Sequence, residues 1–155
     1  MKNYTSYDLI EWGKPFEKSQ HALPEPTLSE VLIRVTAAGL CHSDLHVQKG
    51  YMDLGEEGRL TFAERGAQLP MTFGHEIAGI VEAIGDKVKN VSIGQQVIVF
   101  PWIGCGDCLA CNEDRESDCS AMRIIGLKQK GGFATHCIIE NEKFLVDING
   151  LDAAE

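Results

Sequence analysis

Four of the six cysteines lie close together in the second half of the chain, with a spacing that suits a metal site. Cys105, Cys108, Cys111 and Cys119 form the pattern C-x2-C-x2-C-x7-C. The segment around them has little apolar content, so it cannot fold on hydrophobic burial alone. Four thiolates closing tetrahedrally around one Zn²⁺ would fix it and supply the missing folding free energy. Because such a site is closed to substrate, we predict a structural zinc.

Two alternatives stay open for these four cysteines. Bacterial ferredoxins also begin C-x2-C-x2-C, but they continue with x3 and Cys-Pro, whereas here the last gap is seven and Ser120 follows. The second alternative is a set of free or disulfide-bonded surface cysteines, which would leave four clustered thiols without a partner in a reducing cell. Ligand type and spacing favour zinc over both.

A second group of metal-binding side chains is divided between two places in the chain. Cys41 lies just beyond a predicted strand, and His75 and Glu76 lie just before another. Thiolate and imidazole are good zinc ligands, and a site with few protein ligands leaves a position open for water or an alcohol oxygen. Taken alone, one cysteine and one distant histidine are more simply a buried apolar cysteine and a core histidine.

The neighbours of Cys41 favour a catalytic metal site. Asp44 could orient the imidazole or tune the metal from outside the ligand set. Ser43 and His46 could pass a proton from a buried alcohol to solvent. One local segment therefore supplies a ligand, a hydroxyl and a base.

The elements that must position these side chains are mainly strands. Runs rich in β-branched residues recur between glycines and predict strands over residues 31–38, 77–84, 97–100, 133–139 and 144–148. A short helix is expected over residues 40–47, and a surface loop or lid over 53–68. We expect Cys137 in the core and His21 in a solvated loop. Several short strands with frequent turns favour a β-barrel or β-sandwich.

Composition limits the classes of protein and partner. With 155 residues, 44% of them hydrophobic and 24% charged, the chain can bury the core of one domain. Its 14 Lys and Arg against 23 Asp and Glu give a net charge of −9, which argues against nucleic acid and membrane surfaces as partners. It has no apolar stretch of roughly 18 residues and no apolar run of a signal peptide at its start. We expect a cytoplasmic protein.

Three motifs occur in a fixed order along the chain. They are the run Cys41-His42-Ser43-Asp44-Leu45-His46, the triplet Gly74-His75-Glu76 and the four-cysteine segment. Together they resemble the zinc-dependent medium-chain alcohol dehydrogenases. The resemblance covers nearly the whole chain and implies that residues 1–155 form the family's N-terminal GroES-like catalytic domain. That domain is mainly β: a partly open β-barrel with a few short helices and a lobe that binds a structural zinc.

The resemblance also implies roles for the residues around Cys41. Cys41 and His75 would bind the catalytic zinc, and Glu76 would be the adjacent acid that can approach or exchange onto the metal. Ser43 and His46 would form the proton relay. Asp44 keeps the orienting role inferred above.

Two further residues and the reaction itself follow from the same resemblance. His42 would contact the cofactor pyrophosphate, and Trp102 resembles an aromatic that lines the substrate pocket, with a core tryptophan as an equal alternative. The implied reaction interconverts small-molecule alcohols with aldehydes or ketones, with NAD or NADP as hydride carrier. Zinc lowers the pKa of the alcohol so that an alkoxide forms near neutral pH, and hydride then moves to the nicotinamide.

The chain departs from a full-length member of this family in three ways. It has no G-x-G-x-x-G between a strand and a helix, the signature of a dinucleotide-binding Rossmann domain. The C-terminal strands that return to the catalytic domain are absent, and the third protein ligand of the catalytic zinc would lie beyond Glu155. We therefore expect a fragment with little or no hydride transfer by itself and a lowered affinity for the catalytic zinc. A homo-oligomer is expected at full length, since the family associates largely through its cofactor domain.

A function of a different class stays open: a zinc-stabilised interaction module without catalysis, in which only the four-cysteine lobe matters. The two hypotheses make different demands on Cys41. Its replacement by serine should leave zinc content and fold unchanged in an interaction module, but should abolish alcohol turnover in the full-length enzyme.

Overall fold

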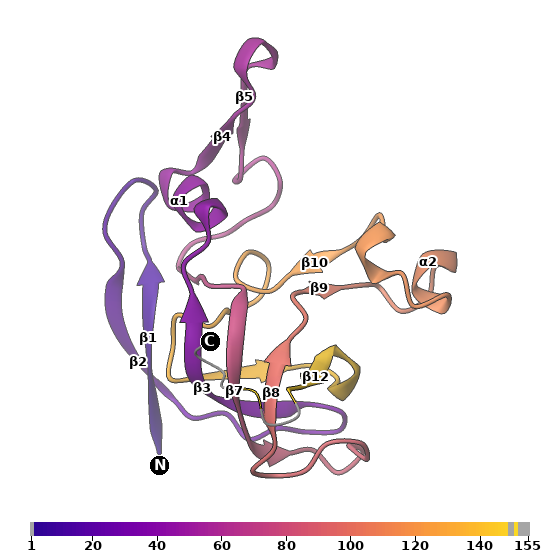
Figure 1. The fold of residues 1–155 in the computed structure, drawn as a ribbon. Coiled ribbons are helices and arrows are strands. Elements are labelled where there is room, and N and C mark those ends of the chain that lie inside the picture. Colours follow the sequence, from indigo (N-terminus) through magenta and orange to yellow (C-terminus); the bar gives the residue numbers. More distant parts are fainter. Residues whose placement is uncertain (1, 149–150, 152–155) are drawn as a thin grey trace.

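Strands dominate the computed structural model, which describes residues 2–148 and 151 (Figure 1). The largest sheet is antiparallel, with the order β11-β3-β7-β8-β12. Its strands are β3 (Val31–Gly39), β7 (Glu76–Ile84), β8 (Gln96–Val99), β11 (His136–Ile139) and β12 (Leu145–Asp147). The edge strands β11 and β12 do not pair with each other, so in the described residues this sheet is not a closed barrel. The prediction of a mainly β, partly open architecture is confirmed.

Smaller sheets flank the main one. One contains β2 (Glu17–Ala22), β1 (Asn3–Leu9) and β6 (Met71–Thr72); a ribbon of β4 (Tyr51–Asp53) and β5 (Arg59–Thr61) projects from the body; and β9 (Trp102–Ile103) pairs with β10 (Arg123–Ile124) (Figure 1). The helical elements are short: α1 (His42–Lys49), α2 (Leu109–Asn112) and the 3-10 turns η1 (Gly55–Glu57), η2 (Glu116–Asp118) and η3 (Glu142–Phe144). Across the described residues, no helix has the length and apolar character needed to span a membrane.

Most predicted elements are present, with two corrections. The strand predicted over 133–139 begins only at His136, because the residues before it bridge two other strands: the Tyr7 N–H donates to the Phe133 carbonyl, and the Val35 N–H donates to the Thr135 carbonyl. The prediction that residues 53–68 are only a loop is wrong, because η1 and β5 lie within them. The helix predicted over 40–47 is α1, displaced by two residues.

Two apolar clusters hold these elements together. The larger lies on the main sheet and comprises Val31, Ile33, Ile77, Val81, Val97, Val99, Ile103, Ile125, Cys137, Ile139 and Phe144. Cys137 is 5% exposed, as predicted for a core residue, and burial raises the pKa of its thiol to about 12. The smaller cluster comprises Leu9, Val47, Phe62, Ala67 and Phe73, and it packs α1 against β1.

A buried polar cluster joins β1 to its neighbours and corrects the prediction for His21. His21 is not in a solvated loop, because it lies in β2, with Nε2 3.0 Å from Ser6 Oγ and 3.3 Å from Asp8 Oδ2. The Thr72 hydroxyl donates to Asp8 at 2.6 Å. Burial by itself raises the pKa of Asp8, but hydrogen bonds from Thr72, Ser19, Ser6 and His21 outweigh it and leave the pKa below its usual value.

Replacing Asp8 with asparagine should destabilise the fold at neutral pH and reduce its sensitivity to acid. Because folding lowers the pKa of Asp8, its contribution to stability is complete above the unfolded pKa of about 3.9 and is lost as pH falls through the folded pKa. We expect Asp8→Asn to cost about 1–3 kcal/mol at pH 7, and less at acid pH. Urea unfolding across this pH range measures both effects. A constant difference between the two proteins at every pH would contradict this role, and His21→Gln controls for the loss of the neighbouring hydrogen-bond partner.

Candidate metal and substrate site

Cys41 is placed by the junction between β3 and α1. It is the N-cap residue of α1, and its backbone N–H donates to Asp44 Oδ2 at 3.0 Å. Asp44 is the third residue of the helix, so this bond fixes where the helix begins. Gly50, in the left-handed conformation with φ 88°, ends the helix. The short helix therefore begins with the Cys41 thiol and carries Ser43 and Asp44 in its first turn.

His75 and Glu76 reach the same place from β7. Strands β3 and β7 are antiparallel and pair Gly39 with Glu76, so the end of one strand lies beside the start of the other. Gly74 has a φ of 91°, and a Cβ there would stand 2.6 Å from the Phe133 ring. Only glycine permits this turn so close to Phe133, and this packing fixes the backbone that carries His75.

The three potential ligands converge. One donor atom from each of Cys41, His75 and Glu76 lies within 4.8 Å of the other two. Asp44 is 3% exposed and lies behind them, with Oδ1 3.4 Å from His75 Nδ1 while Oδ2 accepts the Cys41 N–H. Ser43 Oγ is 3.2 Å from His75 Nε2. A thiolate, an imidazole and a carboxylate are a donor set that suits zinc, so these residues fit the metal that the resemblance implies.

An apolar pocket opens beside these donors. Its volume is about 670 Å³, and most of its remaining wall comes from Ala37, Ala78, Ile98, Val99, Pro101 and Trp102. A smaller cavity of about 220 Å³ shares Ser43, His75, Pro101 and Trp102 with the pocket and adds apolar side chains that include Met52, Phe62 and Leu127. Trp102 is 39% exposed and borders both spaces, so it is not a core residue.

The structure does not bring every predicted site residue together. His42 and His46 lie one helical turn apart on α1 with their ring centroids 4.8 Å apart; His42 is exposed and His46 is half-buried. Within residues 2–148, no hydrogen bond joins His46 to Ser43, whose partner is His75. The relay expected from the sequence therefore lacks a direct contact between its two members.

Sequence reasoning missed several residues that shape this site. Met52 belongs to β4, and Phe62 lies in the stretch that was predicted as a surface loop. The only available signal was the presence of an aromatic residue in that polar stretch. Gly39 was missed as well, because its importance depends on which residue it opposes in the sheet.

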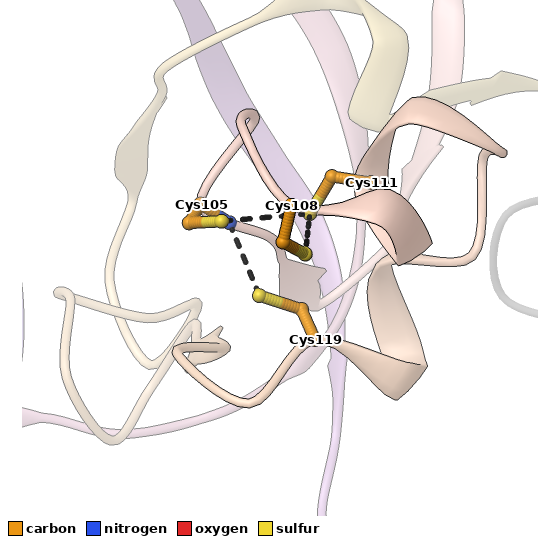
Figure 2. Close-up of side chains that lie close together, drawn as sticks. All are labelled: Cys105, Cys108, Cys111 and Cys119. Atoms are coloured by element: carbon orange, nitrogen blue, oxygen red, sulfur yellow. Dashed lines mark hydrogen bonds between the residues drawn. The ribbon is translucent and has the colours of Figure 1, made fainter.

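The four-cysteine lobe extends from β9 and β10, away from the main sheet (Figure 1). Its four sulfur atoms face one another, and each lies within 4.8 Å of the other three (Figure 2). The Cys111 sulfur is 3.5 Å from that of Cys108 and 3.9 Å from that of Cys105. Four zinc–sulfur bonds of about 2.3 Å in a tetrahedron separate the sulfurs by about 3.8 Å, so the cluster has the size that one zinc requires.

The thiols of the lobe influence one another's ionisation. The backbone N–H groups of Asp107 and Cys108 donate to Cys105 and lower the pKa of its thiol to about 6. The Gly106 N–H lowers the pKa of Cys111, but burial and the neighbouring thiols outweigh it and raise that pKa to about 11. A negative charge on one sulfur thus makes ionisation of the next thiol less favourable. A divalent cation would offset this repulsion and allow the thiols to ionise together.

An ion pair that could not be predicted from the sequence connects the lobe to η3, which directly precedes β12 of the main sheet. Lys143 Nζ in η3 donates to Glu116 Oε1 in η2 at 2.5 Å. The hydrogen bond from Lys143 lowers the pKa of Glu116, which is otherwise buried beside the cysteines. The lobe is therefore held to the domain both by β9 and β10 and by the ion pair between Glu116 and Lys143.

Comparison with known proteins places this arrangement in a family. Residues 27–150 match the family model described as the alcohol dehydrogenase GroES-like domain. An NAD-dependent alcohol dehydrogenase of Sulfurisphaera tokodaii is 39% identical over 148 residues, which are 95% of this chain and 41% of that protein. The crystal structure of the D-arabinose dehydrogenase from Sulfolobus solfataricus has a TM-score of 0.81 and 29% identity, covering 99% of this chain and 42% of that one.

A metal-containing structure also superposes. The cobalt- and zinc-bound thermostable alcohol dehydrogenase from Pyrobaculum aerophilum has a TM-score of 0.80 and 26% identity, over 99% of this chain and 44% of that one. The chain spans about two fifths of the length of the curated relatives it matches. Because the family model matches most of this chain, including both groups of donors, the chain belongs to the alcohol dehydrogenase GroES-like domain family.

Proposed function

We propose that residues 1–155 form the catalytic, substrate-binding domain of a zinc-dependent dehydrogenase that interconverts alcohols with aldehydes or ketones, using NAD or NADP. The observation that carries this proposal is the convergence of Cys41, His75 and Glu76 at an apolar pocket. Relatives named as NAD-dependent alcohol dehydrogenases support it. A non-catalytic interaction module would give this second donor set no role.

Different residues around the pocket would bind the zinc and orient its ligands. Cys41 and His75 would hold the catalytic zinc, with Glu76 as a further donor. When bound, zinc supplies a Lewis acid that lowers the pKa of an alcohol hydroxyl. The Asp44 carboxylate beside Nδ1 favours the proton on that nitrogen and leaves Nε2 of His75 free as a ligand.

Proton movement would begin at Ser43. Its hydroxyl lies 3.2 Å from His75 Nε2, so it borders the place that a group bound to this nitrogen would occupy, and it can accept a hydrogen bond from a substrate hydroxyl. His46, half-buried on the next turn of α1, would then carry the proton outward. Since the structure shows no direct bond between Ser43 and His46, we propose that a water molecule bridges them.

The pocket favours an alcohol that carries an apolar group. Its walls beyond the donors are apolar, and the smaller cavity behind Trp102 is lined by further apolar side chains. A hydrophobic substituent of the substrate would bury its surface there while the hydroxyl meets Ser43. His42, exposed at the start of α1, would meet the cofactor pyrophosphate, and the lobe would hold a second, structural zinc.

A domain exchange tests the proposed function. The purified 155-residue chain should show little or no NAD- or NADP-dependent alcohol oxidation. When it replaces the corresponding part of the Sulfurisphaera tokodaii enzyme, alcohol-dependent reduction of NAD should appear, and Cys41→Ser should reduce it by at least about a hundredfold. A folded hybrid that binds NADH yet oxidises none of a panel of alcohols would show that the proposal is wrong.

A further inference from the structure

Gly39 makes an unusually close approach to Glu76. The two residues are paired across β3 and β7. A Cβ built on Gly39 would overlap a carboxylate oxygen of Glu76, and it would stand 2.9 Å from Glu76 Cβ and 3.2 Å from Cδ. The Glu76 side chain therefore occupies the space that a side chain at position 39 would fill. This path across β3 leads the carboxylate to the Cys41 thiol, two residues further along the chain.

The backbone does not itself require glycine at this position. Gly39 lies in an extended strand and has no positive φ, in contrast to Gly74. The three atoms that a Cβ would meet most closely all belong to the side chain of Glu76. Rotation of the Glu76 side chain can relieve the overlap with its carboxylate, but Glu76 Cβ moves only with the backbone of β7. Alanine at position 39 should therefore displace the Glu76 carboxylate and slightly widen the spacing between β3 and β7 at this pair.

We propose that Gly39 is a positioning residue for the metal site: by lacking a side chain, it holds the Glu76 carboxylate within donor distance of Cys41 and His75. Catalytic zinc sites use three protein ligands, and the described residues of this site otherwise offer a thiolate and an imidazole. The glycine thereby sets how tightly the chain binds the metal. This inference rests on the proposed catalytic zinc site and adds a residue of β3 that acts on its ligand set.

The test is a Co²⁺ titration of the 155-residue chain with zinc already in the lobe, because thiolate-to-cobalt absorption then reports binding at Cys41. Gly39→Ala and Glu76→Ala should each weaken Co²⁺ binding about 10- to 100-fold. Their effects should not add in the double variant, since Gly39 acts only through Glu76. The zinc content of the lobe should match that of the unchanged chain, and Gly39→Ala should still unfold in one cooperative thermal transition.

Several outcomes would overturn the inference. One is a Gly39→Ala chain that binds Co²⁺ as tightly as the unchanged chain, and another is equal weakening by Gly39→Ala whether or not Glu76 is present. Failure of Gly39→Ala to fold would contradict the claim that the adjustment stays local to Gly39 and Glu76. If the unchanged chain gives no cobalt–thiolate band, or if Cys41→Ser keeps it, the proposed metal site itself fails; the first two outcomes leave that site intact.

Discussion

Cys111→Ser should release the metal of the four-cysteine lobe and unfold the lobe while the main sheet stays folded. The Cys111 sulfur is buried and within 4 Å of the sulfurs of Cys105 and Cys108. Structural zinc contributes about 10–16 kcal/mol to small domains, so each of the four thiolates contributes on average about 2.5–4 kcal/mol, or about 70- to 900-fold in affinity. Elemental analysis should find the tightly held zinc lost, and limited proteolysis should cut within residues 104–122.

The matched control is Cys41→Ser, which removes a cysteine outside the lobe and should leave the tightly held zinc in place. A Cys111→Ser chain that still holds one zinc per molecule through dialysis against a chelator would refute the structural assignment. The purified unchanged chain should also be colourless, because zinc absorbs no visible light; a broad visible band would favour an iron–sulfur cluster at the same four cysteines.

The lobe could be predicted from the sequence because its chemistry is local. All four ligands fall within residues 105–119, and the segment has few apolar side chains, so a metal is the obvious source of its stability. Its attachment to the rest of the domain could not be predicted in the same way. Glu116 and Lys143 form one of many oppositely charged pairs in the chain, and only the fold brings them to 2.5 Å.

The meeting of Cys41 with His75 does not follow from spacing. It depends on the register between β3 and β7, which shifts twice, between Leu32 and Ile33 and between Val35 and Ala37. A slip of one residue moves every side chain to the other face of a sheet, so two irregularities make the pairing unpredictable from local patterns. The contact between Cys41 and His75 was expected only from the resemblance to a family, and the structure places their donor atoms within 4.8 Å.

The N-terminal hairpin was missed because several of its buried positions are polar. The inward-facing residues of β1 include Ser6 and Asp8, which find partners in Thr72 and His21, so the alternation of apolar and polar residues that marks a strand is absent. The pairing partner β2 is polar except for Ala22. A strand whose buried face is satisfied by hydrogen bonds cannot be recognised by hydrophobic periodicity.

Asp44→Asn should weaken metal binding at the second site about 10- to 100-fold, because Asp44 contacts both Cys41 and His75 from behind. Its Oδ2 accepts the Cys41 N–H at 3.0 Å, and its Oδ1 lies 3.4 Å from His75 Nδ1. Asparagine offers one oxygen and one N–H₂ group, so it can accept from one of these donors but must face the other with a donor of its own. Co²⁺ titration with zinc retained in the lobe measures the loss.

Loss of the helix cap could mimic this effect, since Asp44 also fixes the start of α1 and capping contributes about 1 kcal/mol. Lys49→Gly is the matched control: it lies exposed in the last turn of α1 and should destabilise the helix by about 1 kcal/mol without touching either ligand. If Asp44 positions the ligands, Asp44→Asn weakens cobalt binding and Lys49→Gly does not. Equal weakening by both variants would show that Asp44 acts on the metal site only as a helix cap.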